Sequence, residues 1–325
     1  MRILVTGAAG HLGEGLMRRF AHDGHEVRGL DIKSGPFVDL AGSVADAGIV
    51  REAVDGIEAV VHTATLHKPH VNSHSRREFV VTNVTGTLTL LEEAVRAGVQ
   101  RFVFTSTTSA FGRALRPQPG APAAWITEDV VPVARNIYGV TKVAAEEVCE
   151  LVHRDHGLPV LVLRTSRFFP EADDDDERRG AFADANLKLV ELLYRRADLE
   201  DVVTAHLCAL ERAPQLGFGR YIVSATTPFQ RADVAELRTD PATVILRRTD
   251  SQTAAVFADR GWSMPAEIER VYVNDRARAE LGWDPRYTFY AAIAALAQGQ
   301  DPRSELARTV GAKGYHDRPT GVYTS

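Results

Sequence analysis

Residues 1–31 read MRILVTGAAGHLGEGLMRRFAHDGHEVRGLD, and this stretch decides the fold. It begins with an apolar run of strand length, followed by a turn with three glycines, an amphipathic helical pattern and a second apolar run that closes on Asp31. This order of elements is the layout of a βαβ unit that binds a dinucleotide. We therefore expect an α/β protein built around a parallel sheet.

The three glycines of the turn have separate expected roles in holding a cofactor. Gly7 permits the tight turn, Gly10 lets the backbone approach a pyrophosphate, and Gly13 lets the helix pack close to the strand. The helix begins near His11 and Leu12, where free N–H groups and the positive end of the helix dipole face the phosphates. All five residues are therefore candidate cofactor contacts.

Asp31 bears on which dinucleotide fits. It follows Gly13 by 18 residues, at the end of the second expected strand. A carboxylate there accepts hydrogen bonds from a ribose diol and repels a 2′-phosphate, so NAD is favoured over NADP. Arg28 and Lys33 lie nearby in the sequence, so NADP is disfavoured rather than excluded.

Length and composition are those of a globular protein. The chain has 325 residues, of which 45% are hydrophobic and 25% charged, enough for one large α/β domain with a smaller companion. The formal net charge of −5 gives no reason to expect nucleic acid or an anionic membrane as a partner. No apolar stretch has the length of a membrane span, and the first strand lacks the character of a signal peptide. We expect a cytoplasmic protein.

Strand-like and helical segments alternate through the first half of the chain. This alternation predicts a doubly wound, Rossmann-type parallel sheet with helices on both faces, in which residues 1–165 form the NAD-binding domain. Residues 166–325 are expected to form a smaller, discontinuous, mixed α/β substrate region, with part of 215–250 returning to the sheet. Further expected segments are a helix over 79–97, a loop over 112–135, a strand over 243–246, and a polar tail or arm over 311–325.

After the glycine turn, the second informative feature is the pair Tyr138 and Lys142. Their spacing places both side chains on one face of the helix expected to start at residue 136 or 137. An ammonium near a phenol lowers the phenol's pKa, so Tyr138 can take a hydroxyl proton while a hydride leaves for the cofactor. Several hydroxyl side chains end the fifth expected strand, and one of them can hydrogen-bond the substrate oxygen, while most of them serve local backbone groups.

Taken together, these motifs make the sequence resemble the extended short-chain dehydrogenase/reductases, in their epimerase/dehydratase branch. The resemblance runs from Arg2 to about Leu163 and more weakly to Ala209 and Trp283. The matching motifs are Thr6-Gly7 to Gly13, Asp31, Asp39-Leu40, Val61 to Ala64, Asn83 to Thr87, Leu90 to Ala94, the hydroxyl cluster ending at Gly112, and Tyr138 with Lys142.

The resemblance implies roles for individual residues and for the assembly. It places the catalytic hydroxyl on Thr107, makes Lys142 a holder of the nicotinamide ribose, and makes Asn83 a helix asparagine that supports the active site. The implied cofactor contacts are Asp39 and Leu40 beside the adenine, and Ala64 and Thr65 after the fourth strand. In this family the helices around 83–97 and 138–156 often pair between subunits, which implies a homodimer.

Departures from the family pattern narrow the expected chemistry. Thr108 and Ser109 stand where the 4,6-dehydratases carry an Asp-Glu pair, so dehydration of that type is disfavoured. Arg164 is followed by Thr-Ser-Arg instead of the Tyr-Phe-Asn of members that bind nucleotide sugars, and little chain follows from which to build a nucleotide pocket. We therefore expect a smaller hydroxylated or carbonyl substrate, contacted by Thr108, Ser109 and Arg167. Arg167 can clamp an anionic group, with plain surface charge as the alternative.

Two further stretches invite a metal-site interpretation. His67, His70 and His74 approach ligand spacing, but no cysteine or carboxylate joins them nearby, so solvated or substrate-contacting histidines fit better and we expect no metal. The acidic run over 173–177 is typical of a solvated loop, here as a possible lid.

The sequence thus predicts an NAD-dependent oxidoreductase of the extended type with Tyr138 as acid/base. It acts on a hydroxyl or carbonyl carbon of a small substrate, and sugar-derived compounds are among the candidates. One alternative is an NAD-dependent epimerase that keeps its cofactor bound and has no net redox change. The other alternative is a protein that senses NAD and catalyses nothing.

Overall fold

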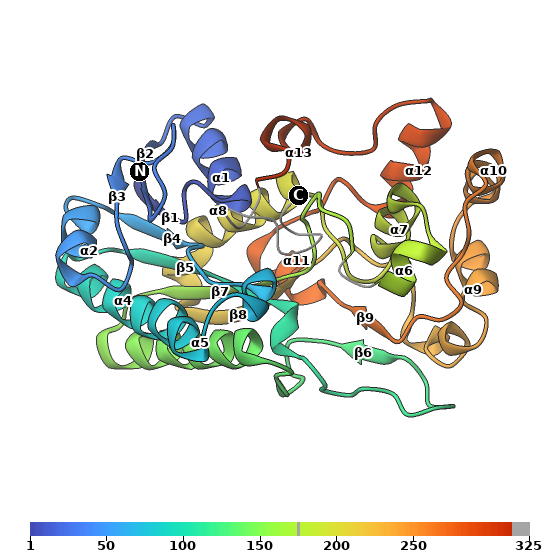
Figure 1. The fold of residues 1–325 in the computed structure, drawn as a ribbon, viewed down its shortest axis with the longest axis horizontal. Helices are drawn as coiled ribbons and strands as arrows, with labels where there is room; N and C mark the ends of the chain where they lie inside the picture. The colour runs from blue at the N-terminus through green and yellow to red at the C-terminus, as the bar shows by residue number, and fades with distance from the viewer. Residues whose placement is uncertain (174–175, 314–325) are drawn as a thin grey trace.

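The computed structural model describes residues 1–173 and 176–313, and its centre is a seven-stranded parallel sheet (Figure 1). The strands are β1 (Arg2–Thr6), β2 (Glu26–Asp31), β3 (Leu40–Ala41), β4 (Ala59–His62), β5 (Arg101–Thr107), β7 (Val160–Thr165) and β8 (Phe218–Val223). Their order is β3-β2-β1-β4-β5-β7-β8. The order reverses between β1 and β4, and in such sheets ligands bind at the carboxyl ends of the strands beside this reversal. The expected doubly wound fold is confirmed.

Helices cover both faces of this sheet. One face carries α1 (His11–His22) and α8 (Leu199–Leu216), and the other carries α2 (Ala47–Val54), α4 (Gly86–Arg96) and α5 (Ile137–His156). Side chains alternate along a strand, so Ile3 and Val5 pack with α1 and α8, whereas Leu4 packs on the opposite side. Both layers are apolar, as a parallel sheet buried on two faces requires.

The helix expected over 79–97 is interrupted. It consists of α3 (Arg76–Val80), a π-helical turn η2 (Val81–Thr85) and then α4. A π turn inserts one extra residue into the helical repeat and is frequent at functional sites. Asn83 lies in this turn.

A smaller region lies to the right of the sheet in Figure 1. Its helices are α6 (Asp176–Ala181), α7 (Asp184–Glu191), α9 (Pro241–Arg248), α10 (Ser251–Arg260) and α12 (Phe289–Ala297). A two-stranded parallel sheet joins β6 (Ala124–Ile126) to β9 (Arg270–Tyr272). The remaining elements are α11 (Asp275–Leu281), α13 (Glu305–Val310) and the 3₁₀ turns η1 (Lys68–Asn72), η3 (Thr108–Ala110), η4 (Arg231–Asp233) and η5 (Glu236–Arg238).

Two local expectations are wrong. Residues 243–246 form part of helix α9 instead of a strand, because Asp240 caps the helix by accepting from the backbone N–H of Thr243, and Pro241 is the first helical residue. Tertiary packing of Val244 and Ile245 in the core of the small region outweighs their β propensity. The expected loop over 112–135 contains strand β6, which is too short to leave a periodic pattern.

The end of the described chain returns to the first helix. Helix α13 packs against α1, and residues 311–313 continue along it, whereas the rest of the expected tail, 314–325, lies outside the described residues. Within 1–173 and 176–313, no helix combines the length and apolarity needed to cross a membrane.

Candidate active site

A cavity of about 1160 Å³ opens at the carboxyl ends of the central strands. Of the residues expected to contact cofactor or substrate, those lining it are Gly7, Gly10, His11, Leu12, Gly13, Asp31, Ala64, Thr65, Thr107, Thr108, Ser109, Tyr138 and Arg167. Asp39, Leu40, Asn83 and Lys142 do not line it. The fold therefore gathers most of the predicted site from six separate segments of the chain.

Helix α1 packs closely against the glycine turn, as the three glycines of the sequence predict. Gly7 has a φ of +74°, a conformation that side chains other than glycine rarely adopt. A Cβ atom on Gly13 would lie 1.9 Å from the carbonyl oxygen of Gly7, so only glycine lets α1 approach the turn this closely. Gly10 caps α1 without a side-chain acceptor, which leaves the first N–H groups of the helix for a ligand.

Asp31 lies at the end of β2 on the wall of the cavity. Its Oδ2 accepts from the backbone N–H of Ala9 at 3.0 Å, and its Oδ1 accepts from that of Lys33 at 2.9 Å. These bonds hold the carboxylate between the glycine turn and the loop after β2. A carboxylate retains further lone pairs in this arrangement and can accept from a diol.

Asp39 and Leu40, which the resemblance places beside the adenine, lie outside the lining of the cavity. The carboxylate of Asp39 accepts from the backbone N–H of Gly29 at 2.7 Å and thereby joins β2 to the segment before β3. Strand β3 ends only at Ala41, so the residues that follow its carboxyl end, Ser43 and Val44, line the cavity in their place.

Tyr138 and Thr107 meet inside the cavity. Asn136 caps α5 by accepting from the N–H of Gly139 at 3.1 Å, which places Tyr138 in the first helical turn. Thr107 ends β5, and its hydroxyl accepts from the backbone N–H of Ser109 at 3.0 Å. Burial raises the pKa of Tyr138 to about 12, although the nearby side chain of Thr107 acts in the opposite direction. The phenol is therefore neutral at physiological pH.

Lys142 lies on the same helix but is buried beneath the cavity. Its Nζ donates to the carbonyl oxygen of Thr105 at 2.6 Å and lies 4.0 Å from the centre of the Phe104 ring. Burial lowers the pKa of Lys142 to about 7, against the charge of Glu146, which raises it. The pKa of Tyr138 is raised although Lys142 lies on the same helix, because burial penalises the phenolate.

Asn83 lies outside the cavity lining and hydrogen-bonds two segments next to it. Its Nδ2 donates to the carbonyl of Leu66 at 2.8 Å and to the hydroxyl of Thr141 at 3.0 Å. Its Oδ1 accepts from the N–H of Leu66 at 2.8 Å and from the hydroxyl of Thr65 at 3.0 Å. One amide thus ties the cavity-lining loop after β4 to helix α5, which carries Tyr138.

A buried ion pair that sequence reasoning missed fixes α5 to the sheet. Arg164 in β7 donates to Glu146 in α5 at 2.7 Å, and both side chains are almost fully buried. Ser106 in β5 also donates to Glu146, and Arg164 stacks on Phe111 with its Cζ 4.8 Å from the ring centre. The sequence did contain a sign of this ion pair. Arg164 follows four apolar residues in the strand, and an arginine buried in this way requires an acidic partner.

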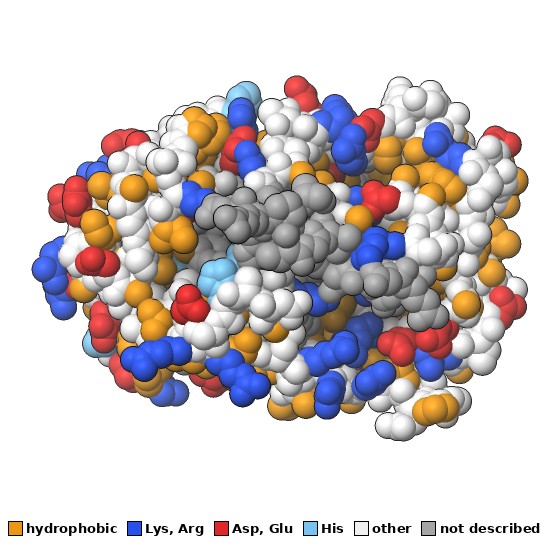
Figure 2. All heavy atoms as spheres, in the orientation of Figure 1, with side chains coloured by type: hydrophobic (Ala, Val, Ile, Leu, Met, Phe, Trp, Pro, Cys, Tyr) orange, Lys and Arg blue, Asp and Glu red, His pale blue; other side chains and the backbone are white. Residues whose placement is uncertain are grey.

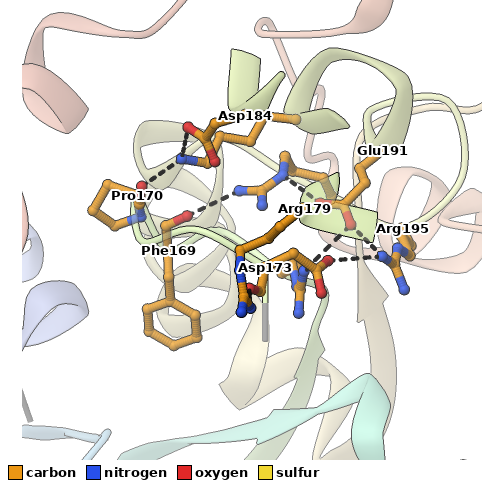
Figure 3. A network of polar contacts seen from close by, with 10 residues as sticks. Phe169, Pro170, Asp173, Arg179, Asp184, Glu191 and Arg195 are labelled. Carbon is orange, nitrogen blue, oxygen red and sulfur yellow. Dashed lines mark hydrogen bonds and ion pairs between the residues drawn. The ribbon is translucent and has the colours of Figure 1, made fainter. Parts of the chain in front are cut away.

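Arg167 lines the cavity and joins a network of opposite charges. Figure 3 shows Asp173, Glu191 and Arg195 of this network. It pairs with Asp173 and lies 3.4 Å from Glu191, while Arg195 pairs with the same two carboxylates. Burial alone would raise the pKa of Glu191, but Arg195, Arg196 and Arg167 lower it to about 2. Asp173 is buried, so the expected solvated acidic loop is wrong at this residue, and 174–175 lie outside the described residues.

The histidine loop also reaches the cavity. His67 and His70 line it, with ring centres 4.7 Å apart, and the ring of His67 lies 5.5 Å from that of Phe169. His74 contacts His70, with ring centres 5.0 Å apart, and does not line the cavity. Across the residues that the structure describes, no cluster of three or more metal-binding side chains occurs.

Comparison with known protein families shows which family the chain belongs to. Residues 3–222 match the family described as NAD dependent epimerase/dehydratase. The chain belongs to this family. It is accordingly an NAD-dependent enzyme of the extended short-chain dehydrogenase/reductase type, whose members include dehydrogenases, dehydratases and epimerases.

Individual family members resemble the chain over different lengths. A 3 beta-hydroxysteroid dehydrogenase/Delta 5-->4-isomerase from Mycobacterium tuberculosis is 26% identical over 334 residues, covering 90% of this chain and 88% of that protein. A dTDP-glucose 4,6-dehydratase from Streptomyces niveus is 35% identical over 194 residues, covering 52% of this chain and 55% of that protein. A short-chain dehydrogenase/reductase superfamily protein from Agrobacterium tumefaciens, solved with bound NAD, has a TM-score of 0.64 at 22% identity, covering 95% of this chain and 99% of that chain.

Proposed function

We propose that this family member is an oxidoreductase that transfers a hydride between NAD and a hydroxyl or carbonyl carbon of a small, sugar-derived substrate. The observation that carries the proposal is that Tyr138 and Thr107 both line the cavity, close enough for Thr107 to lower the pKa of the phenol. Two hydroxyl groups that meet in this way can bind one substrate oxygen and stabilise the charge that develops on it.

The protonation of Tyr138 sets its part in the reaction. With a pKa of about 12 the phenol holds its proton, and it can donate that proton to a carbonyl oxygen as the carbon is reduced. In the oxidising direction the phenol must first lose its proton, which requires a positive charge near it. Bound NAD supplies the hydride acceptor and a positively charged ring.

The residues at the other end of the cavity fit a dinucleotide. The Gly7–Gly13 contact leaves no room for a Cβ, so backbone N–H groups of the turn and of α1 face the space where a pyrophosphate would bind. Asp31 would accept from the hydroxyls of the adenine ribose. We propose NAD in preference to NADP, because a 2′-phosphate beside Asp31 would place two anions together.

A substrate panel tests this function. Sugars, uronates, hydroxy acids and simple alcohols are incubated with NAD, and NADH is followed by its ultraviolet absorbance. We expect one class to yield NADH, and Tyr138→Phe to lower its kcat by about 100-fold or more while binding NADH normally. Tyr290→Phe is the control, because it removes a phenol hydroxyl that donates to the carbonyl of Arg248 away from the cavity lining, and it should leave kcat unchanged.

Two other outcomes identify the alternatives. A substrate that changes configuration while no free NADH accumulates would identify an epimerase. If no class is converted and Tyr138→Phe retains the biological effect of the protein, the chain binds NAD as a sensor and the proposed chemistry is wrong.

A further inference from the structure

Four arginines line one side of the cavity and are called here the arginine wall. They are Arg113, Arg116 and Arg135, which are exposed, and Arg270, which is half-buried. Figure 2 shows Lys and Arg side chains gathered on the face of the molecule near β6 and β9, the elements next to these segments. This side of the cavity is separate from the glycine turn, so it is not explained by the phosphates of a dinucleotide.

The backbone clamps together the two segments that carry three of these arginines. Gly112 and Val133 form a parallel bridge, and the N–H of Arg113 donates to the carbonyl of Val133 at 2.7 Å. Gly112 has a φ of +52°, and a Cβ there would lie 2.2 Å from the carbonyl oxygen of Val133. Only glycine therefore allows the approach that brings the segments of Arg113 and Arg135 side by side.

Two neighbouring elements hold this clamp in place. Arg270 in β9 donates from Nη1 to the carbonyl of Gly112 at 3.2 Å. On the other side, Ala134 packs on the first turn of α5, where a Cβ on Gly139 would meet the Cβ of Ala134 at 3.2 Å. The wall is thus anchored to the same helical turn as Tyr138.

The charge of the arginine wall differs from that of the rest of the cavity. Arg167, Arg195 and Arg196 form ion pairs with the carboxylates of Asp173 and Glu191. These arginines therefore have acidic partners within the protein.

The exposed members of the wall have no such balance. Within 1–173 and 176–313, no ion pair or side-chain hydrogen bond engages the guanidinium groups of Arg113, Arg116 and Arg135. Glu269 is the acidic residue that lines the cavity next to Arg270, and its Oε1 lies 3.8 Å from Nη1 of Arg238 in the small region. Its ion pair is therefore with Arg238 and not with the wall. Like charges held beside one cavity repel each other, and an anion in the cavity relieves that repulsion.

We propose that the arginine wall binds a phosphate group of the substrate, so that the substrate is a phosphorylated hydroxyl or carbonyl compound. A phosphate monoester carries a charge of about −1.5 to −2 and three acceptor oxygens, which suit several guanidinium forks at once. A carboxylate carries one charge and is satisfied by a single fork. The inference rests on the proposed function, because it assumes that the substrate's reacting oxygen binds at Tyr138 and Thr107.

The test measures binding to protein saturated with NADH, which occupies the glycine turn and leaves the substrate end open. Glucose 6-phosphate, inorganic phosphate, glucuronate and glucose are titrated calorimetrically at low ionic strength. We expect both phosphates to bind more tightly than glucuronate and glucose. In the double variant Arg113→Gln/Arg135→Gln, phosphate binding should weaken by about tenfold or more, with the Kd of NADH unchanged.

Arg154→Gln is the matched control, because Arg154 is an exposed arginine of α5 that does not line the cavity. It should leave phosphate binding unchanged. Equal binding of glucuronate and the phosphates, no phosphate binding, or undiminished binding by the double variant would each overturn the proposal. Failure of NADH itself to bind would instead contradict the proposed function, so the two failures are distinguishable.

Discussion

The ring of His11 donates from Nδ1 to the carbonyl oxygen of Gly311 at 2.8 Å, across 300 positions of the chain. Because a carbonyl only accepts, this bond fixes the proton on Nδ1, and burial lowers the pKa of His11 to about 4, so the ring is neutral. Beside it, Lys313 pairs with Glu14 and lines the cavity. The end of the described chain therefore completes the wall of the cavity next to the glycine turn.

We expect Lys313→Ala to weaken NADH binding by about three- to tenfold. The substitution removes a positive charge from the phosphate end of the cavity. It also leaves the negative charge of Glu14 without its Lys313 partner, and that charge repels the phosphates. Burial acts to raise the pKa of Glu14, but hydrogen bonds from Lys313 and Arg18 hold it below its usual value. Fluorescence titration with NADH measures the effect.

Arg308→Ala controls for the loss of charge, because Arg308 is exposed on α13 and does not line the cavity. NADH affinity should be unaffected in this variant. Equal weakening by both variants would mean that general charge, and not the Lys313–Glu14 contact, governs the cofactor end.

Asn83→Ala should lower both the stability and the turnover. It removes four hydrogen bonds and leaves the hydroxyl of Thr141, on the buried side of α5, and the backbone N–H of half-buried Leu66 without this partner, so we expect a loss of about 2–4 kcal/mol in the free energy of unfolding. Because Tyr138 is then less firmly placed against the loop after β4, kcat should fall more than the affinity for NADH. Urea unfolding and steady-state kinetics provide the two measurements.

Asn186→Ala provides the comparison for this effect. Asn186 is buried in α7 and bonds both backbone groups of Ser263, at 3.0 and 3.1 Å, away from the cavity lining. It should lose comparable stability and keep its kcat. If Asn83→Ala also keeps its kcat, the amide serves stability alone.

The local parts of this fold could be predicted from sequence, and the long-range parts could not. The glycine turn and its helix follow from apolar periodicity and from the rule that parallel strands end at one edge, whereas the choice of Thr107 among several hydroxyls comes from the family resemblance. The contact of His11 with Gly311 leaves no periodic trace, because it joins two segments far apart in the chain. The close contact of Gly112 with Val133 could not be predicted either, because nothing in the sequence distinguishes this glycine from the others until the fold places Val133 beside it.

His62 should make the protein less stable in acid. Its ring lies between the hydroxyls of Thr6 and Thr87, at 2.7 and 3.0 Å, and burial lowers its pKa from 6.5 to about 3, with the charge of Lys142 acting in the same direction. Between these two pH values the unfolded chain binds a proton that the native state does not. Stability contributed by the neutral ring is therefore present above pH 6.5 and is lost as the pH falls towards 3, at up to about 1.4 kcal/mol per pH unit.

The variant His62→Gln isolates this contribution. Glutamine can hydrogen-bond both threonines and does not titrate, so the slope of unfolding free energy against pH should be shallower than in the wild type. His206 shifts in the same direction and Asp201 in the opposite one, so the difference between the two proteins is the informative quantity. Urea unfolding at several pH values supplies it, and identical slopes would contradict the assignment.

We also propose that the outer face of α5 is the contact between two subunits. Val140 and Leu151 are 51% and 40% exposed and lie eleven positions apart, which is three helical turns, so they share one face of α5. Val80 and Val81, on the adjoining helical segment, are 44% and 42% exposed. Large apolar side chains gathered on neighbouring helices are typical of a surface that another protein covers.

Leu151→Glu tests this surface, because a dimer would bury two such carboxylates against apolar side chains. We expect the wild type to have the mass of a dimer by light scattering and Leu151→Glu that of a monomer. Leu246→Glu places the same charge at a leucine that is 45% exposed on α9, remote from α5, and should remain dimeric. A wild-type monomer, or a Leu151→Glu variant that stays dimeric, would place the subunit contact elsewhere or remove it. Retention of NADH binding by the monomer would show in addition that each cavity is complete within one chain.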